Sequence, residues 1–174
     1  YGHKGIPVMA LSGVDLALWD LLGKAENRPI YELLGGLKKS GVRACASTNE
    51  FERDRDAGFT AVKFGSRWSG HESDYDETVA MAAHARAVFG PEALVMTDCY
   101  MSWDSAVTRQ MARLLDEYRL YWFEDVLTPD DLGEMAALRE SVKPILVAGG
   151  EHEFTQHGFA AVARAGALDL WQPD

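Results

Sequence analysis

Three acidic residues recur at nearly equal intervals in the second half of this 174-residue chain, each after a short apolar run. Asp98, Glu124 and Glu151 lie 26 and 27 residues apart. One strand plus one helix has this length, so in a barrel of alternating strands and helices the three carboxylates would reach the same mouth. Converging carboxylates repel one another unless a cation compensates their charge, and ligand sets made only of oxygen favour Mg²⁺. The spacing therefore predicts a magnesium site.

A second interpretation of these acids is purely structural. A carboxylate at the end of a strand can cap the helix that follows, because it accepts hydrogen bonds from free backbone N–H groups and interacts favourably with the helix dipole. This interpretation suits a single acid well. Three acids at intervals of one strand–helix unit favour the shared metal site.

The elements that must position these acids are visible as alternating patterns from residue 42 onward. Short apolar runs predict strands at residues 42–46, 61–64, 94–97, 120–123, 145–148 and 168–171. Helical patterns predict helices at residues 9–22, 29–34, 77–89, 105–118, 130–142 and 155–165. The connection at residues 47–60 is barely long enough for a helix and two loops. We expect either a short helix there or unrepresented residues near Asp54.

This alternation predicts parallel strands joined by right-handed crossovers, as in a doubly wound sheet or a (β/α)8 barrel. A doubly wound nucleotide-binding domain would carry a glycine-rich turn after its first strand, and residues 46–49 (Ala-Ser-Thr-Asn) contain no glycine. We therefore predict an α/β fold of the TIM-barrel type at residues 39–174, preceded by a helical segment at residues 1–38. About six of the eight strands are expected, so the barrel is incomplete and we expect the natural protein to be longer.

The composition excludes several other function classes. With 27 acidic against 17 basic side chains the net charge is −10, which disfavours nucleic acid and anionic membranes as partners. No apolar run approaches the roughly 20 residues of a membrane span, and no signal-peptide pattern opens the chain. Cys45 and Cys99 lack metal-binding or redox spacing, so we expect two buried thiols in a cytoplasmic protein.

Seven short motifs in a fixed order resemble the mandelate racemase subgroup of the enolase superfamily, and within it the rhamnonate dehydratase family. The resemblance covers essentially the whole chain. The motifs are residues 12–21 (Ser-Gly-Val-Asp-Leu-Ala-Leu-Trp-Asp-Leu), 33–36 (Leu-Leu-Gly-Gly), 62–63 (Val-Lys), 97–103 (Thr-Asp-Cys-Tyr-Met-Ser-Trp), 122–125 (Trp-Phe-Glu-Asp), 150–153 (Gly-Glu-His-Glu) and 172–174 (Gln-Pro-Asp).

The resemblance implies a modified barrel that residues 1–38 connect to a separate capping domain, in a protein that forms homo-oligomers. It implies that Asp98, Glu124 and Glu151 bind one Mg²⁺, and that the substrate is a sugar acid whose carboxylate and 2-hydroxyl chelate this ion. The C2 proton is then removed and the 3-hydroxyl is lost, which gives a 2-keto-3-deoxy acid. Mg²⁺ would stabilise the negative charge of the enediolate.

The resemblance also suggests the acid–base residues. Asp174 matches an Asp that orients a catalytic His, and that His would lie beyond residue 174. His152 matches a His that contacts substrate. At the second strand, racemases of the subgroup carry Lys-x-Lys, whereas this chain has Lys63 followed by Phe and Gly65. The missing second lysine favours one-base dehydration over two-base racemisation.

Two basic side chains complete the predicted site. Lys63 is a candidate substrate-binding residue, although a lysine at a barrel rim can simply extend into solvent. Arg67 could bind a substrate carboxylate or instead pair with the acids at residues 72–74. Three alternatives to a rhamnonate dehydratase stay open. They are a dehydratase of another sugar acid such as L-lyxonate, an epimerase, and a non-catalytic fragment.

Overall fold

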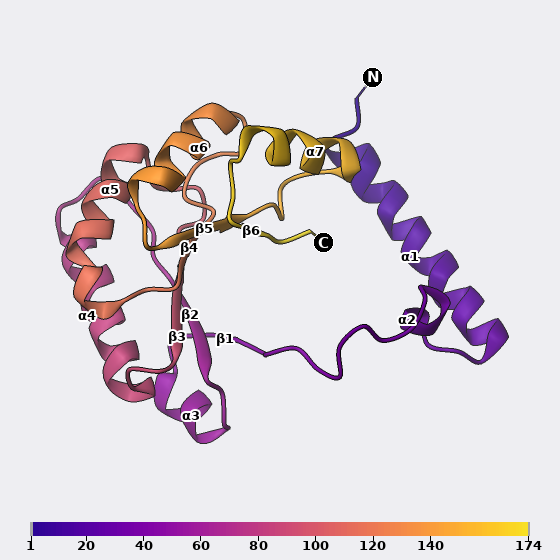
Figure 1. Cartoon of the computed structure of the whole chain (residues 1–174), viewed down its shortest axis with the longest axis horizontal. Helices are drawn as coiled ribbons and strands as arrows, with labels where there is room; N and C mark the ends of the chain where they lie inside the picture. The colour runs from indigo at the N-terminus through magenta and orange to yellow at the C-terminus, as the bar shows by residue number, and fades with distance from the viewer. Residues whose placement is uncertain (1, 174) are drawn as a thin grey trace.

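The computed structural model describes residues 2–173, in which six parallel strands form one sheet in the order of the chain (Figure 1). The strands are β1 (Ala46–Ser47), β2 (Ala61–Gly65), β3 (Leu94–Asp98), β4 (Trp122–Glu124), β5 (Leu146–Gly149) and β6 (Leu170–Trp171). The helices are α1 (Ile6–Glu26), α2 (Ile30–Leu33), α3 (Phe51–Asp56), α4 (Ser73–Phe89), α5 (Ser105–Leu114), α6 (Leu132–Ser141) and α7 (Thr155–Ala165), with a 3₁₀ turn η1 (Asp116–Tyr118). The predicted alternation of parallel strands and helices is confirmed.

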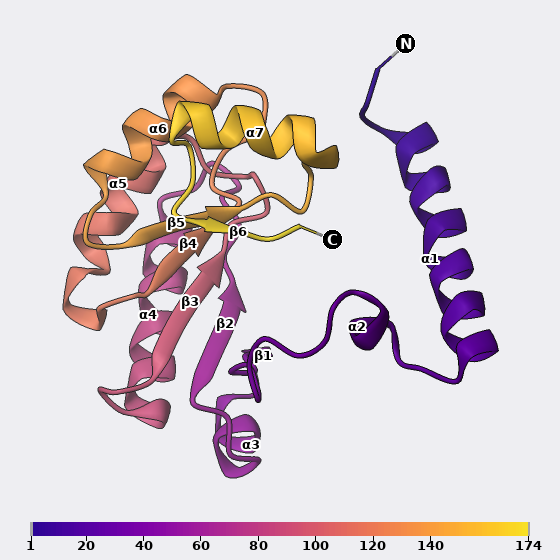
Figure 2. The same ribbon diagram turned by 45° about the vertical axis from the view of Figure 1, so that its right-hand side comes forward.

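Helices α4 to α7 lie along the outer side of the sheet, and the strands rotate progressively from β2 to β6 (Figures 1 and 2). This rotation is the ordinary twist of a parallel sheet, and it gives the sheet the curvature of a barrel wall. In register, Gly65 lies beside Asp98, and Asp98 lies beside Glu124. The last residues of neighbouring strands therefore share one edge, which we call the carboxyl edge.

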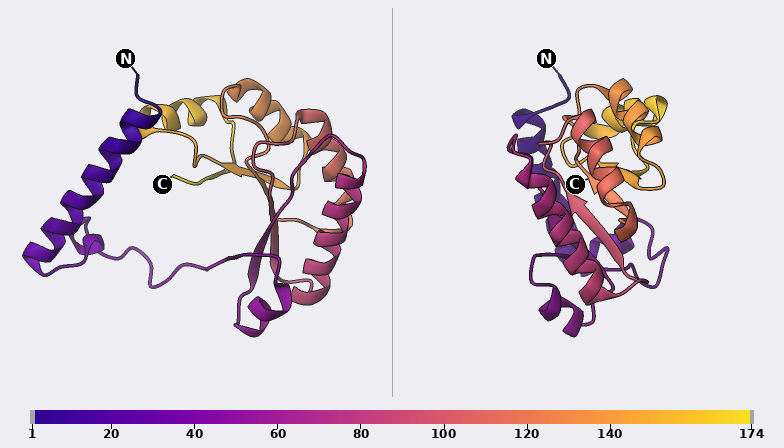
Figure 3. Two further views of the ribbon diagram at one scale, coloured as in Figure 1. Left: turned by 180° about the vertical axis from the view of Figure 1, so that it is seen from behind. Right: turned by 90° about the vertical axis from the view of Figure 1, so that its left-hand side faces the viewer.

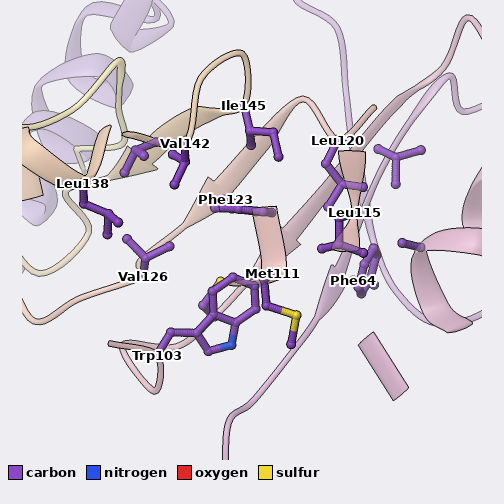
Figure 4. Close-up of a cluster of buried hydrophobic side chains, with 14 of the residues drawn as sticks. Phe64, Trp103, Met111, Leu115, Leu120, Phe123, Val126, Leu138, Val142 and Ile145 are labelled. Atoms are coloured by element: carbon purple, nitrogen blue, oxygen red, sulfur yellow. The ribbon is translucent and has the colours of Figure 1, made fainter. Parts of the chain in front are cut away.

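The core fills the space between the sheet and these helices (Figure 4). Helix α5 is amphipathic, and its residues Val107 and Met111 are buried together with Leu115, four residues further on. The indole of Trp103 meets the ring of Phe123 edge to face, with ring centroids 5.2 Å apart. This packing fixes the strands whose ends form the carboxyl edge.

At the opposite edge of the sheet, the side chain of Arg86 joins two turns. Its guanidinium donates five hydrogen bonds of 2.8 to 3.4 Å to backbone carbonyl groups before β3 and before β4. The acceptors are the carbonyl oxygens of Gly90, Pro91, Ala93, Tyr118 and Arg119. One side chain thus binds carbonyl groups of both turns, and only the Pro91 carbonyl has a second side-chain donor among the described residues, the guanidinium of Arg119.

Replacing Arg86 by Met should lower the free energy of unfolding by about 3 kcal/mol, because charged hydrogen bonds are lost and their acceptors are left unpaired. Arg86→Lys should lose less, since an ammonium keeps the charge but cannot span both turns. Urea denaturation measures both. Arg164→Met, at an exposed position of α7, is the control and should stay within about 0.5 kcal/mol of wild type. An equal loss in the control would contradict the structural role of Arg86.

The first strand–helix unit is smaller than predicted. Residues 42–45 are not in a strand, and only Ala46 and Ser47 pair with β2. The connection at residues 47–60 contains the six-residue helix α3. Of the two expectations for this connection, a short helix is therefore the one observed. The helix is anchored by Phe51, which is fully buried and packs edge to face on Phe64. The expectation for the thiols was right for Cys99, which is buried, and wrong for Cys45, which is exposed.

Helix α1 stands apart from the sheet and approaches it only near α7 (Figures 1 and 3). There the Lys4 ammonium lies 2.9 Å from the buried Glu153 carboxylate. The apolar side chains of α1 are mostly exposed, among them Leu11 and Leu18 at 66% and 59%. Contrary to our expectation that no segment qualifies, α1 is long and apolar enough to cross a membrane, judged by length and composition only.

Candidate active site

Lys63 connects two of the predicted metal ligands at the carboxyl edge. Its ammonium is hydrogen-bonded to the Glu124 carboxylate and lies 3.4 Å from Oδ2 of Asp98. The second oxygen of Glu124 accepts a 3.0 Å hydrogen bond from the indole N–H of Trp122. The side chain of Glu124 is 1% exposed, and those of Asp98 and Lys63 are 15% and 16% exposed. A buried carboxylate pair with one cation between its members is thus in place.

The neighbouring charges determine the protonation state of Lys63. Burial alone would lower the pKa of its ammonium, but the hydrogen bond and the charge of Glu124, together with Asp98, outweigh it and raise that pKa. Lys63 is therefore a permanent cation between the two carboxylates. It does not extend freely from the barrel rim, which was the alternative interpretation.

Glu151, the third predicted ligand, lies in a second group at the same edge. Among residues 2–173, the potential ligand atoms of Asp125, Glu151 and His152 all lie within 4.8 Å of one another. The His152 Nε2 atom is 3.3 Å from Glu151 and 3.5 Å from Asp125. The side chains of Glu151 and His152 are about half exposed, whereas that of Asp125 is 10% exposed.

Asp125 shows how crowded the negative charge is. Its burial and the neighbouring charge of Glu151 raise the pKa of its carboxyl group to about 6, and Glu124 and Asp98 add to the shift. Four carboxylates lie at this edge, and the single ammonium of Lys63 does not balance their negative charge. Their oxygen atoms are potential metal ligands. This donor set fits a divalent ion such as Mg²⁺.

The remaining predicted residues have different positions. The Arg67 guanidinium lies 4.5 Å from the centroid of the Tyr100 ring, and it is not ion-paired with the acids at residues 72–74. Asp74 instead accepts hydrogen bonds from Ser69. Asp174 lies outside the described residues, and its role stays a prediction. Sequence reasoning did not assign Asp125 to the site, although this residue directly follows Glu124 and ends the motif at residues 122–125.

The chain matches two family descriptions in succession. Residues 46–174 match the family described as enolase C-terminal domain-like, and residues 3–35 match the N-terminal domain of mandelate racemase / muconate lactonizing enzyme. The chain therefore belongs to the mandelate racemase subgroup of the enolase superfamily, as its motifs predicted. The whole of the apolar helix α1 falls within the second match and so is an element of a family domain.

Three relatives illustrate the similarity. The L-rhamnonate dehydratase of Saccharopolyspora erythraea is 34% identical over 177 residues, which cover 100% of this chain and 45% of that protein. The crystal structure of rhamnonate dehydratase from Gibberella zeae complexed with Mg has a TM-score of 0.91 at 33% identity, covering 100% of this chain and 43% of that one. An enolase from Bradyrhizobium complexed with magnesium and mandelic acid has a TM-score of 0.85 at 32% identity, covering 99% and 49%.

The chain spans less than half the length of each of these relatives. Its six strands therefore correspond to part of an enolase-superfamily barrel, and the predicted incomplete TIM-type barrel is confirmed.

Proposed function

We propose that the protein is a magnesium-dependent lyase that dehydrates a sugar acid, with L-rhamnonate or a stereochemical neighbour as substrate. The observation that carries the proposal is the Asp98–Lys63–Glu124 arrangement at the carboxyl edge, with Glu151 two residues beyond the end of β5. Two relatives named rhamnonate dehydratases, one of them crystallised with Mg, support the reaction class.

Asp98, Glu124 and Glu151 would hold the metal. When bound, Mg²⁺ supplies the positive charge that stabilises negative charge developing on the substrate carboxylate. Lys63 adds a fixed cation beside it. Because the site already concentrates carboxylates, an anionic substrate binds there only when this excess of negative charge is compensated.

Proton transfer falls to imidazole groups. His152 is half exposed at the carboxyl edge, and in this proposal it would exchange a proton with a substrate hydroxyl. Asp174 would orient a second imidazole from the next strand of the complete barrel, and that imidazole would remove the C2 proton. With Gly65 at the end of β2, that strand offers no second base, which supports dehydration over racemisation.

The experiment is a panel of sugar acids incubated with the complete gene product, with Mg²⁺ or with EDTA. Formation of a 2-keto-3-deoxy acid only with Mg²⁺ is the expected result, and the panel identifies the substrate. Exchange of the C2 proton with solvent deuterium without loss of water would identify an epimerase instead. Binding of neither Mg²⁺ nor any sugar acid would indicate a non-catalytic protein and overturn the proposal.

A further inference from the structure

The last residue of β2 leaves a space that another side chain fills. A Cβ atom placed on Gly65 would lie 2.6 Å from the Tyr100 hydroxyl oxygen and 2.9 Å from Cε2 of the same ring. Both distances are shorter than any ordinary contact, so the Tyr100 ring occupies the place of a side chain at position 65. The Gly65 backbone is in an ordinary strand conformation, and the glycine is therefore needed for space.

The loop after β3 holds Tyr100 in this place at a conformational cost. Tyr100 and Met101 both have left-handed backbones, with φ of 52° and 55°. Such conformations are unfavourable for residues other than glycine and persist only where the surroundings enforce them. Here the Tyr100 N–H donates to Asp98 Oδ1 at 3.1 Å, and the Met101 N–H donates to the Asp125 carbonyl oxygen at 2.6 Å. The ring is thereby fixed relative to a proposed metal ligand.

The exposed parts of this arrangement are polar. Tyr100 is 45% exposed, and its hydroxyl forms no hydrogen bond with any residue of the described part of the chain. The Arg67 guanidinium stacks on the ring as a cation–π pair. In register, Gly65 lies beside Asp98, so the hydroxyl and the guanidinium border the carboxyl edge on its β2–β3 side.

We propose that Tyr100 is a substrate-contacting residue whose hydroxyl donates a hydrogen bond to an oxygen of the bound hydroxy acid. Gly65 provides the space for the ring, and Arg67 packs over the ring face and adds positive charge toward an anionic ligand. This inference rests on the proposed function for the class of ligand. It adds a specificity-determining contact on the side of the site opposite to β6.

The first test uses Tyr100→Phe, which removes only the hydroxyl, with Tyr31→Phe on α2 as the control because Tyr31 is 46% exposed. In the complete gene product with saturating Mg²⁺, Tyr100→Phe should lower kcat/KM and the calorimetric affinity for L-rhamnonate about 10-fold or more, since the hydrogen bond to the substrate is lost. Mg²⁺ affinity and melting temperature should stay at wild-type values. An affinity and a kcat/KM within twofold of wild type would overturn the contact.

The second test examines the geometry without any substrate. Gly65→Ala should lower the melting temperature, and the same substitution in a Tyr100→Ala background should not, because the clash with the ring is gone. Gly41→Ala is the control, since a Cβ there meets nothing within 4 Å. Equal losses in both backgrounds would contradict the placement of the ring.

The outcomes separate this inference from the proposed function. Turnover of a sugar acid that is insensitive to Tyr100→Phe overturns the contact alone. Binding of L-rhamnonate that weakens in Tyr100→Phe, without turnover, supports the contact and overturns the dehydratase. If wild type binds no hydroxy acid of the panel, both are overturned.

Discussion

Glu124→Gln lowers magnesium-dependent turnover of the sugar acid by about 10³-fold, because it removes a carboxylate that holds the ion opposite the developing negative charge. Magnesium affinity, measured by calorimetry, should fall at least about 10-fold. The amide keeps the shape of the side chain and its oxygen can still accept the hydrogen bond from Lys63, but its NH₂ group cannot accept the bond that Trp122 donates. The melting temperature of the variant, measured beside its turnover, therefore separates loss of charge from loss of folding.

The matched control is Glu153→Gln. Glu153 is also a buried glutamate near the carboxyl edge, but its carboxylate pairs with Lys4 and is not among the proposed ligands. This variant should keep magnesium affinity and kcat/KM within about threefold of wild type. Undiminished turnover in Glu124→Gln, or an equal loss in Glu153→Gln, would contradict the assignment of the metal site.

Lys63→Met destabilises the metal-free protein by about 3 kcal/mol. The substitution leaves the Glu124 carboxylate, which is 1% exposed, without its cation and beside a second carboxylate, and breaking one partner of a buried ion pair costs this much. Mg²⁺ should restore much of the lost stability, because it binds the folded carboxylates and supplies the missing charge. Urea denaturation with EDTA and with Mg²⁺ measures the difference.

Two further variants sharpen this experiment. Lys143→Met removes the cation of an exposed pair with Glu140 and should change stability by less than about 1 kcal/mol in either condition. The double variant with Glu124→Gln should be more stable than Lys63→Met alone, since no unpaired buried charge remains. A loss of stability in Lys63→Met that Mg²⁺ does not reduce would show that the ion does not supply the charge that Lys63 provides at this carboxylate pair.

Helices with strong terminal signals were predicted accurately from the sequence. The bounds of α7 agree with the prediction at residues 155–165, because Gly166 ends the helix in a left-handed conformation with φ of 62°. Helix α4 begins at Ser73, four residues before the predicted start. Its buried residues are the small side chains Thr78, Ala82 and Ala85, so the apolar periodicity that locates a helix is weak.

The first strand shows what an apolar run cannot predict. Val42 lies in a run typical of a buried strand, yet it is 84% exposed. Burial of a strand depends on a partner, and only Ala46 and Ser47 reach β2. Local sequence carries no information on where pairing with a neighbour begins.

The sequence predicted those parts of the site that the regular spacing of the strand ends determines. The spacing of Asp98 and Glu124 placed them side by side, because both end neighbouring strands. Contacts made by the loops were not predictable in this way. Asp125 has a left-handed backbone with φ of 44°, and so does Tyr100. A sequence indicates this conformation reliably only at glycine, so the direction of these two side chains could not be predicted. The grouping of Asp125 with His152 and the place of the Tyr100 ring follow from those turns.

The order of the strands in the sheet has a consequence for synthesis on the ribosome. Within residues 2–173, each strand pairs only with the strands immediately before and after it in the chain. Contacts between near neighbours in sequence close small loops and form quickly, whereas distant pairings delay folding and leave strand edges open to aggregation. Every strand–helix unit can therefore join the growing sheet as it emerges, and the carboxyl edge is assembled in the order Asp98, Glu124, Glu151 during translation.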